Sequence, residues 1–194
     1  MGTYSNTEAV KKIYDSGLKM FTGRALADLV GKERGQDLVR AVKRLVKAGV
    51  LEKLERDKYV LAGFRPEMFE MARFLYQPSY ISFETALNHW GILSQFPYEV
   101  TSATVKKPVV KKVEGKVFSY SHVKQDLFFG YEKQGDGMLA MPEKALLDQV
   151  YLYTKGLKGL TIDEYDLERI DKKRLFEYGV KYPNYTQMRS LIGI

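Results

Sequence analysis

The residues from Arg34 to Leu61 constrain the fold of this chain more than any other stretch. Within residues 36–48, apolar side chains recur at spacings of one, three and four positions. That spacing is typical of one stripe along a helix with 3.6 residues per turn. The stripe consists of Leu38, Val39, Val42, Leu45 and Val46. Mostly basic residues project from the opposite side, so the sequence predicts an amphipathic helix with one apolar and one cationic face.

The segments around this helix complete a recognisable order. After Gly49, a polar turn at 55–58 separates two short apolar segments, which is typical of a β-hairpin. Before the basic helix, we expect one helix near the N-terminus and a second between Thr22 and Gly31. Threonine commonly caps the start of a helix and glycine its end. Three helices followed by a hairpin are the order of a winged helix-turn-helix domain.

In such a domain the last helix lies in the major groove of DNA, so its exposed side chains become candidate contacts. Arg40 or Arg44 is expected to read guanine, and Gln36 to read adenine. Lys43 and Lys47 are expected to meet phosphates, which position a protein without specifying sequence. The complete set of candidate DNA-binding residues is Arg34, Gln36, Arg40, Lys43, Arg44, Lys47, Arg56 and Lys58, the last two on the hairpin. Two alternatives stay open: the charges solvate a helix face, or the domain binds a protein.

The distribution of charge favours a polyanionic partner for the first part of the chain. The net charge is +7 over 194 residues. Residues 1–64 hold thirteen Lys and Arg against eight Asp and Glu, which gives +5; residues 65–194 hold eighteen against sixteen, which gives +2. The smaller part therefore carries most of the excess, although a solubilising surface has the same composition.

The remainder of the chain predicts a mixed domain that follows a short joint at 62–66. Helices are expected near 66–76, 82–90, 145–153, 167–178 and 185–192. Alternating or apolar segments separated by turn signals predict a small, mostly antiparallel sheet. Its strands are expected at 100–105, 109–113, 117–120 and 127–131. The expected fold class is α+β, with a winged helix-turn-helix domain over 1–64 and an α+β effector domain over 65–194.

No constellation of residues in the sequence indicates an enzyme. His89 and His122 lack acidic neighbours, so each is interpreted as a packed or surface histidine. Glu114 and Lys116 have the spacing found in some nucleases, but no aspartate occurs between Asp57 and Asp126 to share a metal ion. Phosphate-binding loops, nucleophile elbows and zinc-protease motifs are missing, and the chain has no cysteine. We therefore expect no catalytic residue, metal ion or cofactor.

A second group of basic residues surrounds two predicted turns of the effector domain. It consists of Lys106, Lys107, Lys111, Lys112 and Lys116. These residues are a possible second basic surface, which would extend the DNA contact or meet an acidic partner protein. The alternative is protection of a sheet edge, because lysine at an edge strand discourages aggregation.

Several short blocks resemble the AbiEi-type antitoxins. In the first part they are Phe21-Thr22, Leu45–Leu51 and Lys58–Leu61. In the second part they are Pro78–Ser82, Ala86-Leu87, His89–Gly91, Phe129-Gly130 and Pro142–Asp148. The resemblance spans about residues 20–155, and the tail after about Leu157 resembles no family.

This resemblance implies the antitoxin of a type IV toxin–antitoxin system. Such proteins bind inverted repeats in the double-stranded DNA of their own promoter through the winged helix and repress the operon. Their second domain is associated with neutralising a nucleotidyltransferase-like toxin, often without a stable complex. A stand-alone winged-helix transcriptional regulator and a protein-interaction module are the alternatives.

The compartment is inferred by elimination. No apolar run approaches the ~20 residues that cross a bilayer, and the N-terminus lacks the features of a signal peptide. The absence of cysteine suits the cytosol. We expect a cytoplasmic protein without membrane contact.

Overall fold

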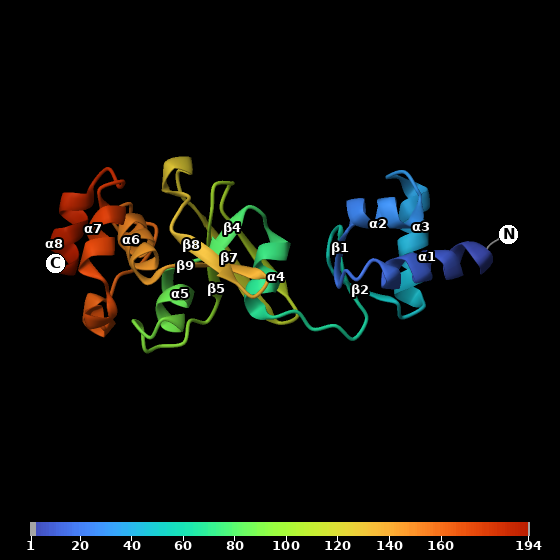
Figure 1. The fold of residues 1–194 in the computed structure, drawn as a ribbon, viewed down its shortest axis with the longest axis horizontal. Coiled ribbons are helices and arrows are strands. Elements are labelled where there is room, and N and C mark those ends of the chain that lie inside the picture. The colour runs from blue at the N-terminus through green and yellow to red at the C-terminus, as the bar shows by residue number, and fades with distance from the viewer. Residues whose placement is uncertain (1–2, 194) are drawn as a thin grey trace. The chain divides into compact units, whose positions relative to one another are not determined.

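The structure is a computed structural model, and it describes residues 3–193, with the side chains of residues 3–6 left aside. The chain divides into two compact units, Met1–Pro66 and Glu67–Ile194. Both combine helices with a β-sheet, so the fold class is α+β, as predicted (Figure 1). The units are described separately below. Among the described residues, no helix has both the length and the apolar character needed to cross a membrane.

The first unit contains three helices and a three-stranded antiparallel sheet. Its elements are α1 (Thr3–Asp15), β1 (Met20–Thr22), α2 (Gly23–Val30), α3 (Gln36–Lys47), β2 (Leu51–Glu55) and β3 (Lys58–Leu61). The sheet has the order β1-β3-β2. Thr22 caps α2 by accepting a 3.2 Å hydrogen bond from the amide of Ala25, and Gly31 ends the helix in the left-handed conformation. Both caps were predicted and are confirmed.

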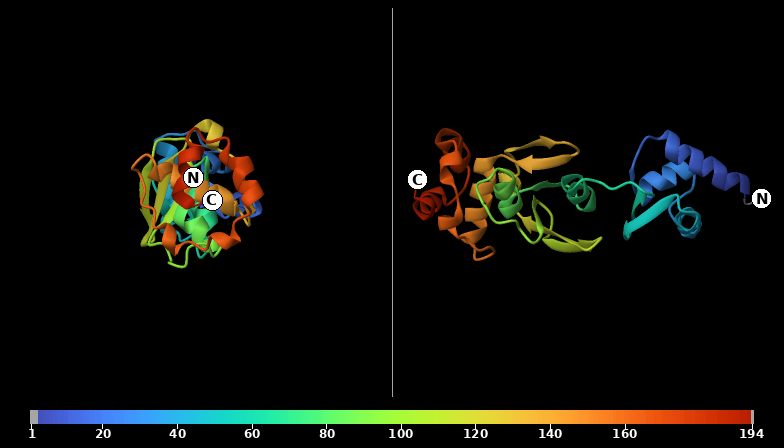
Figure 2. Two further views of the ribbon diagram at one scale, coloured as in Figure 1. Left: turned by 90° about the vertical axis from the view of Figure 1, so that its left-hand side faces the viewer. Right: turned by 90° about the horizontal axis from the view of Figure 1, so that it is seen from below.

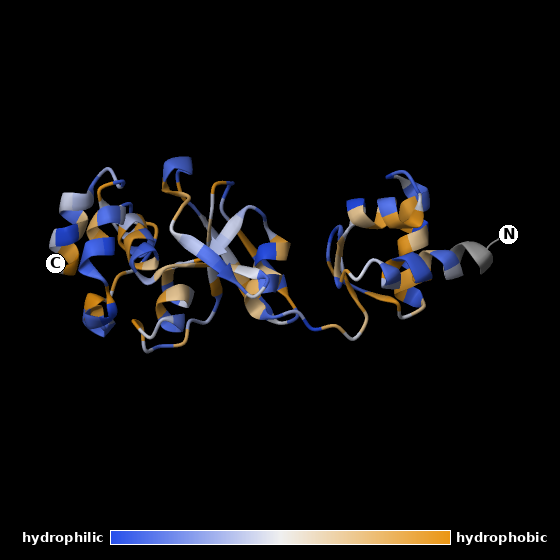
Figure 3. Cartoon of the chain, viewed as in Figure 1, coloured by the Kyte–Doolittle hydropathy of each residue, from blue (hydrophilic) through white to orange (hydrophobic). Residues whose placement is uncertain are grey.

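The core of the first unit forms where α3 packs against α1, α2 and the sheet. Leu38, Val42 and Leu45 are buried there, together with Ile13 and Phe21. Figure 3 shows hydrophilic and hydrophobic residues alternating along these helices, as amphipathic helices require.

The predicted apolar stripe of α3 needs one correction. Val39 is 53% exposed, so this member of the stripe does not contribute to the core. The buried residues of α3 centre on Leu38 and Val42, and the side chain of Val39 lies about 100° around the helix from that of Leu38. Val39 therefore faces the hairpin side of the helix and not the core.

The second unit is built on a six-stranded mixed sheet with the order β6-β7-β5-β4-β9-β8. Its strands are β4 (Ser79–Ile81), β5 (Val100–Thr104), β6 (Val109–Val113), β7 (Lys116–His122), β8 (Tyr131–Gln134) and β9 (Gly137–Ala140). Three pairings are antiparallel, whereas β4–β9 and β5–β7 are parallel. The strand predicted at 127–131 is wrong: Leu127 ends a short 3-10 helix, and the strand begins only at Tyr131.

Helices cover both faces of this sheet. They are α4 (Met68–Leu75), α5 (Phe83–His89), α6 (Pro142–Tyr153), α7 (Lys172–Gly179) and α8 (Tyr185–Ile192). The hydroxyl of Tyr120 in β7 donates a 2.6 Å hydrogen bond to the carbonyl of Ala72, which fixes α4 on one face. The other face meets α5 and α6, and α7 and α8 lie beyond α6 (Figures 1 and 2).

Helix α6 is the centre of the second unit. Every residue from Glu143 to Leu152 is buried, because the helix lies between the sheet and the C-terminal helices. Pro142 occupies its first turn, as predicted, where the missing amide hydrogen costs nothing. The helix predicted at 167–178 is shorter than expected: residues 167–169 form a 3-10 turn, and α7 begins at Lys172.

Candidate nucleic-acid interface

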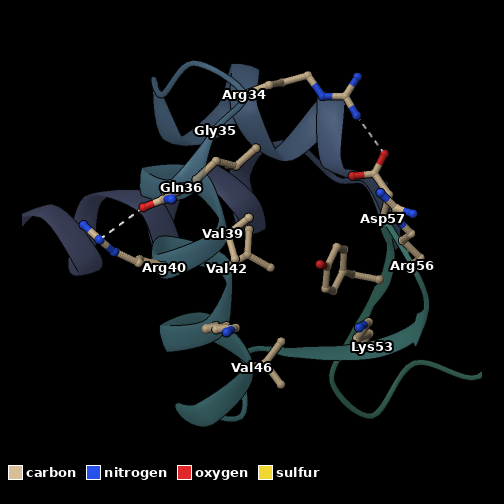
Figure 4. A pocket seen from close by; sticks show the side chains of 13 residues that line it. Arg34, Gly35, Gln36, Val39, Arg40, Val42, Val46, Lys53, Arg56 and Asp57 are labelled. Carbon is tan, nitrogen blue, oxygen red and sulfur yellow. Dashed lines mark hydrogen bonds and ion pairs between the residues drawn. The ribbon is translucent and has the colours of Figure 1, made fainter.

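A groove of about 880 Å³ lies between α3 and the β2–β3 hairpin of the first unit (Figure 4). The helix forms one wall and the hairpin the other. Its floor is apolar, and the residues that form it are Val39, Val42, Val46 and Tyr59. Its rim carries the charged and polar side chains Arg34, Gln36, Arg40, Lys43, Lys53, Arg56 and Asp57. Five of these are basic and one is acidic, so the groove is suited to a polyanion.

The tip of the hairpin is anchored to the start of α2. Asp57 adopts a left-handed conformation with φ 63°, and its carbonyl accepts a 3.1 Å hydrogen bond from the amide of Gly23. A Cβ atom at Gly23 would lie 1.8 Å from Oδ1 of Asp57. A side chain at position 23 would therefore displace the Asp57 carboxylate from its position.

Arg34 closes one end of the groove through an ion pair. Its guanidinium donates a 3.0 Å hydrogen bond to Oδ2 of Asp57 (Figure 4). The two side chains are 63% and 49% exposed, so water screens the pair and its contribution to stability is at most about 1 kcal/mol. A phosphate group would compete with Asp57 for Arg34 at little cost.

Arg40 lies along the exposed face of α3 beside Gln36. Its guanidinium is 3.4 Å from Oε1 of Gln36 and 3.5 Å from the carboxylate of Asp37. Both distances exceed those of strong hydrogen bonds, and the Arg40 and Asp37 side chains are largely exposed. Arg40 is therefore held loosely and is available to an incoming ligand.

The structure gathers five of the eight predicted DNA-binding residues around the groove. Those five are Arg34, Gln36, Arg40, Lys43 and Arg56. Arg44 and Lys47 are exposed on α3 but do not line the groove. Lys58 lies in β3; its ammonium is 2.7 Å from the carboxylate of Glu55, and its side chain is only 19% exposed. Its positive charge is therefore largely balanced by Glu55 within the hairpin.

Sequence reasoning missed two residues on the hairpin wall. Lys53 in β2 lies directly opposite Tyr59 in β3, and both line the groove. A regular hairpin around the turn at 55–58 would pair position 54 with Tyr59. The register shifts between Lys53 and Glu55, so Lys53 pairs with Tyr59 instead, and no signal in the sequence marks this irregularity.

The structure divides the second basic surface predicted in the other unit. The ammonium groups of Lys106 and Lys111 lie 5.5 and 5.8 Å from the ring centre of Tyr76, and the carbonyl of Lys107 accepts a 3.0 Å hydrogen bond from the Tyr76 hydroxyl. Lys112 follows Lys111 in β6 and points to the opposite face of the sheet. Lys116 begins β7, beyond the turn at the far end of β6. The set is thus a group of three around Tyr76 and two separate lysines.

The two histidines are engaged in local contacts. The ring of His89 packs edge-on against Phe69 and Trp90, with centroids 5.5 and 5.1 Å away. Nδ1 of His122 lies 3.1 Å from the carbonyl of Lys106. Within residues 3–193, acidic and histidine side chains form no cluster suited to a metal ion.

A buried polar network organises the second unit. Asp148 in α6 accepts hydrogen bonds of 2.8 Å from the hydroxyls of Tyr80, Ser82 and Tyr182. The ammonium of Lys144, one helical turn earlier, donates to the same carboxylate and to the Tyr182 hydroxyl. Both charged side chains are fully buried. Every one of these polar groups has a partner, as a buried charge requires.

Burial shifts the proton affinities of this network. It lowers the pKa of the Lys144 ammonium, against the opposing effect of the Asp148 carboxylate. Burial and the same carboxylate raise the pKa of Tyr80 and Tyr182 well above the usual value for tyrosine. The network joins β4, α6 and the C-terminal segment through the Asp148 carboxylate.

Two further residues shape the surroundings of Lys144. The ring of Phe129 lies 5.1 Å from its ammonium, with Lys181 4.1 Å away over the same ring. Gly130 has φ 69°, and a Cβ atom there would come within 3.2 Å of the Lys144 stem. The sequence blocks at Pro78–Ser82, Phe129-Gly130 and Pro142–Asp148 therefore meet at one place in the fold.

Comparison with known proteins reveals similarity of fold. No family model matches the chain, and no curated protein matches it by sequence. The crystal structure of the RV2827C protein from Mycobacterium tuberculosis resembles it with a TM-score of 0.61 and 14% sequence identity. The match covers 98% of this chain and 76% of that one. At this identity the likeness concerns the fold alone, and it extends over both units of the chain.

Proposed function

We propose that the first unit is a winged helix-turn-helix domain that binds double-stranded DNA. Helices α2 and α3 form the helix-turn-helix pair, and the β2–β3 hairpin is the wing. The strand β1 pairs with β3 and ties the wing to the helices. This order of elements is the one in which the last helix enters the major groove.

The observation that carries this proposal is the charge around the groove. Five basic side chains and a single carboxylate surround an apolar floor, and α3 forms one wall. A duplex that follows this groove would bring phosphates to Arg34 and Arg56 and base edges to Gln36 and Arg40. Lys43 would neutralise a further phosphate, because its ammonium stands at the outer rim of the helix.

The second unit supports a more specific function, that of an antitoxin which represses its own operon. Three of the blocks that resemble AbiEi-type antitoxins, Pro78–Ser82, Phe129-Gly130 and Pro142–Asp148, lie far apart in sequence but meet at the Asp148 network. Sequence blocks that pack together in one network support the resemblance to these antitoxins more strongly than short matches scattered over the fold. The proposed functional partner is a nucleotidyltransferase-like toxin encoded beside this chain.

DNA binding is tested with the chain's own upstream DNA in a gel-shift series. The full chain is compared with an Arg40→Ala/Lys43→Ala variant and with a charge-matched control, Lys172→Ala/Lys173→Ala, on exposed residues of α7. The groove variant should bind at least about a hundredfold more weakly, since two charge-assisted contacts are worth roughly 1.5–3 kcal/mol each. Equal binding by all three proteins would refute the proposal.

The antitoxin activity is tested separately by co-expression. The chain should restore growth of cells that express a neighbouring nucleotidyltransferase gene, and the groove variant should do so when both genes are driven by foreign promoters. DNA binding without rescue would identify a stand-alone regulator. Rescue without DNA binding would leave toxin control as the only function.

A further inference from the structure

Val39 is an exposed apolar residue at the border between the apolar stripe and the cationic face of α3. Its side chain is 53% exposed and lines the groove between α3 and the hairpin. Gln36 lies three positions before it and Lys43 four positions after it, so the three share one side of the helix. Val39 therefore stands among the side chains that would face a bound duplex.

The packing behind Val39 fixes its position. Val42 is 4% exposed and Val46 is partly buried against the core, so both support the helix wall at this point. Valine is branched at Cβ and keeps one strongly preferred rotamer in a helix. Its two methyl groups are thus presented to the groove in one orientation, and ligand binding need not order them.

The chemistry of valine limits what it can recognise. It has no hydrogen-bond donor, so it cannot bind a phosphate. In the major groove the bases offer donors, acceptors and one apolar group, the 5-methyl of thymine. A second copy of this chain is a poor occupant, because five basic side chains around each groove would repel one another.

We propose that Val39 contacts a thymine methyl group and so makes the DNA interface selective for an A·T base pair at that position. This inference rests on the proposed DNA binding and adds a residue that determines specificity. Gln36, one turn earlier on the same wall, is suited to adenine. Together they assign an A·T preference to the N-terminal half of α3, beside the guanine contact expected for Arg40.

The test begins with the full chain and random-sequence duplex DNA. Bound duplexes are selected and sequenced, and the preferred duplex is then made with deoxyuridine replacing thymidine at one position at a time. Deoxyuridine lacks only the 5-methyl group. At one thymine of the site, the wild-type chain should bind the substituted duplex about fourfold more weakly, the effect of returning one methyl group to water.

Two variants assign that effect to a residue. Val39→Ala should bind the thymine and uracil duplexes equally. Val110→Ala is the matched control, because Val110 is a 60% exposed valine in the other unit. It should keep the fourfold preference. Should Val39→Ala fold poorly, the wild-type comparison alone still decides whether a thymine methyl is read.

The possible results separate this inference from the proposal beneath it. Salt-sensitive binding with no loss at any uracil position overturns the thymine contact and leaves DNA binding intact. A thymine preference that survives in Val39→Ala overturns the role of Val39. If no duplex shows salt-sensitive binding, both the thymine contact and the proposed DNA binding are overturned.

Discussion

The hydroxyl of Tyr182 donates a 2.8 Å hydrogen bond to Oδ1 of Asp148, a residue 34 positions earlier. Asp148 belongs to α6 at the centre of the second unit, whereas Tyr182 lies between α7 and α8. The bond is fully buried, and the same tyrosine accepts from Lys144. The segment after Leu157, which resembles no family in sequence, is therefore an integral part of the network that holds this unit together.

Removing the Asp148 carboxylate should strongly destabilise the second unit. Asp148→Ala leaves the Lys144 ammonium buried without a counter-ion, which typically costs about 3–5 kcal/mol. Urea denaturation of the full chain measures the loss. Asp163→Ala, at an exposed aspartate, is the control and should change the free energy of unfolding little. A loss below about 1 kcal/mol for Asp148→Ala would contradict a structural role for the network.

Tyr182→Phe tests the contribution of the C-terminal segment. It removes one hydroxyl that donates to Asp148 and accepts from Lys144. The free energy of unfolding should fall by about 1.5–3 kcal/mol, the value for hydrogen bonds to charged groups. Tyr153→Phe is the comparison, since Tyr153 is 40% exposed. If both variants unfold at the same urea concentration, the Tyr182 hydroxyl does not anchor the segment.

The helix pattern of the first unit could be predicted from sequence because it depends on neighbours three and four positions apart. Leu38, Val42 and Leu45 are buried as expected. The spacing assigned Val39 to the same stripe, but this residue lies at the edge of the stripe and lines the groove. The periodicity of apolar residues shows on which face of a helix a residue lies. It does not show which part of that face is covered by a neighbouring helix or strand and which part is exposed.

The sheets were harder to predict because their partners are distant. Strand β1 has three residues, Met20–Thr22, and pairs with Val60 and its neighbours. Nothing local marks so short a strand. Similarly, the parallel pairing of Ile81 with Leu139 joins segments that no turn connects. The Lys144–Asp148 pair escaped notice because ions at that spacing usually lie on an exposed helix face, and the fold buried this pair.

Stability should fall in alkaline solution. Burial, with smaller effects from Glu84 and Glu164, raises the pKa of Tyr165 from 10.0 to about 12. Above pH 10 the unfolded chain loses this proton while the folded chain keeps it, so the folded state binds more protons. Its stability is complete below pH 10 and declines by roughly 1 kcal/mol per pH unit up to about pH 12. Urea titrations at several alkaline pH values measure this slope.

Tyr165→Phe isolates this contribution. The variant has no proton to lose at position 165, so its stability should decline less steeply than that of the wild type between pH 10 and 12. Tyr59, Tyr80, Tyr182 and Tyr185, whose pKa values are also raised, contribute to the decline that remains. Parallel declines in the two proteins would show that Tyr165 titrates normally in the folded state.

Gly23→Ala should disturb the groove without touching a basic residue. The new methyl group would meet the Asp57 carboxylate, and the ion pair with Arg34 would break as that carboxylate moves. We expect a loss of stability of about 1–3 kcal/mol, as for other overpacked sites. Gly35→Ala is the control for stability, because a Cβ atom there meets nothing within 4 Å.

The salt dependence of DNA binding tests the central claim most directly. The full chain is titrated with its own upstream duplex by fluorescence anisotropy at increasing salt concentrations. If Arg34, Lys43, Lys53 and Arg56 at the groove each neutralise a phosphate, log K should fall with log salt at a slope of about −3 to −4, and Arg40→Ala/Lys43→Ala should flatten that slope by about 1, the share of Lys43. Binding that does not weaken with salt, or a variant slope equal to that of the wild type, would contradict a DNA interface between α3 and the hairpin.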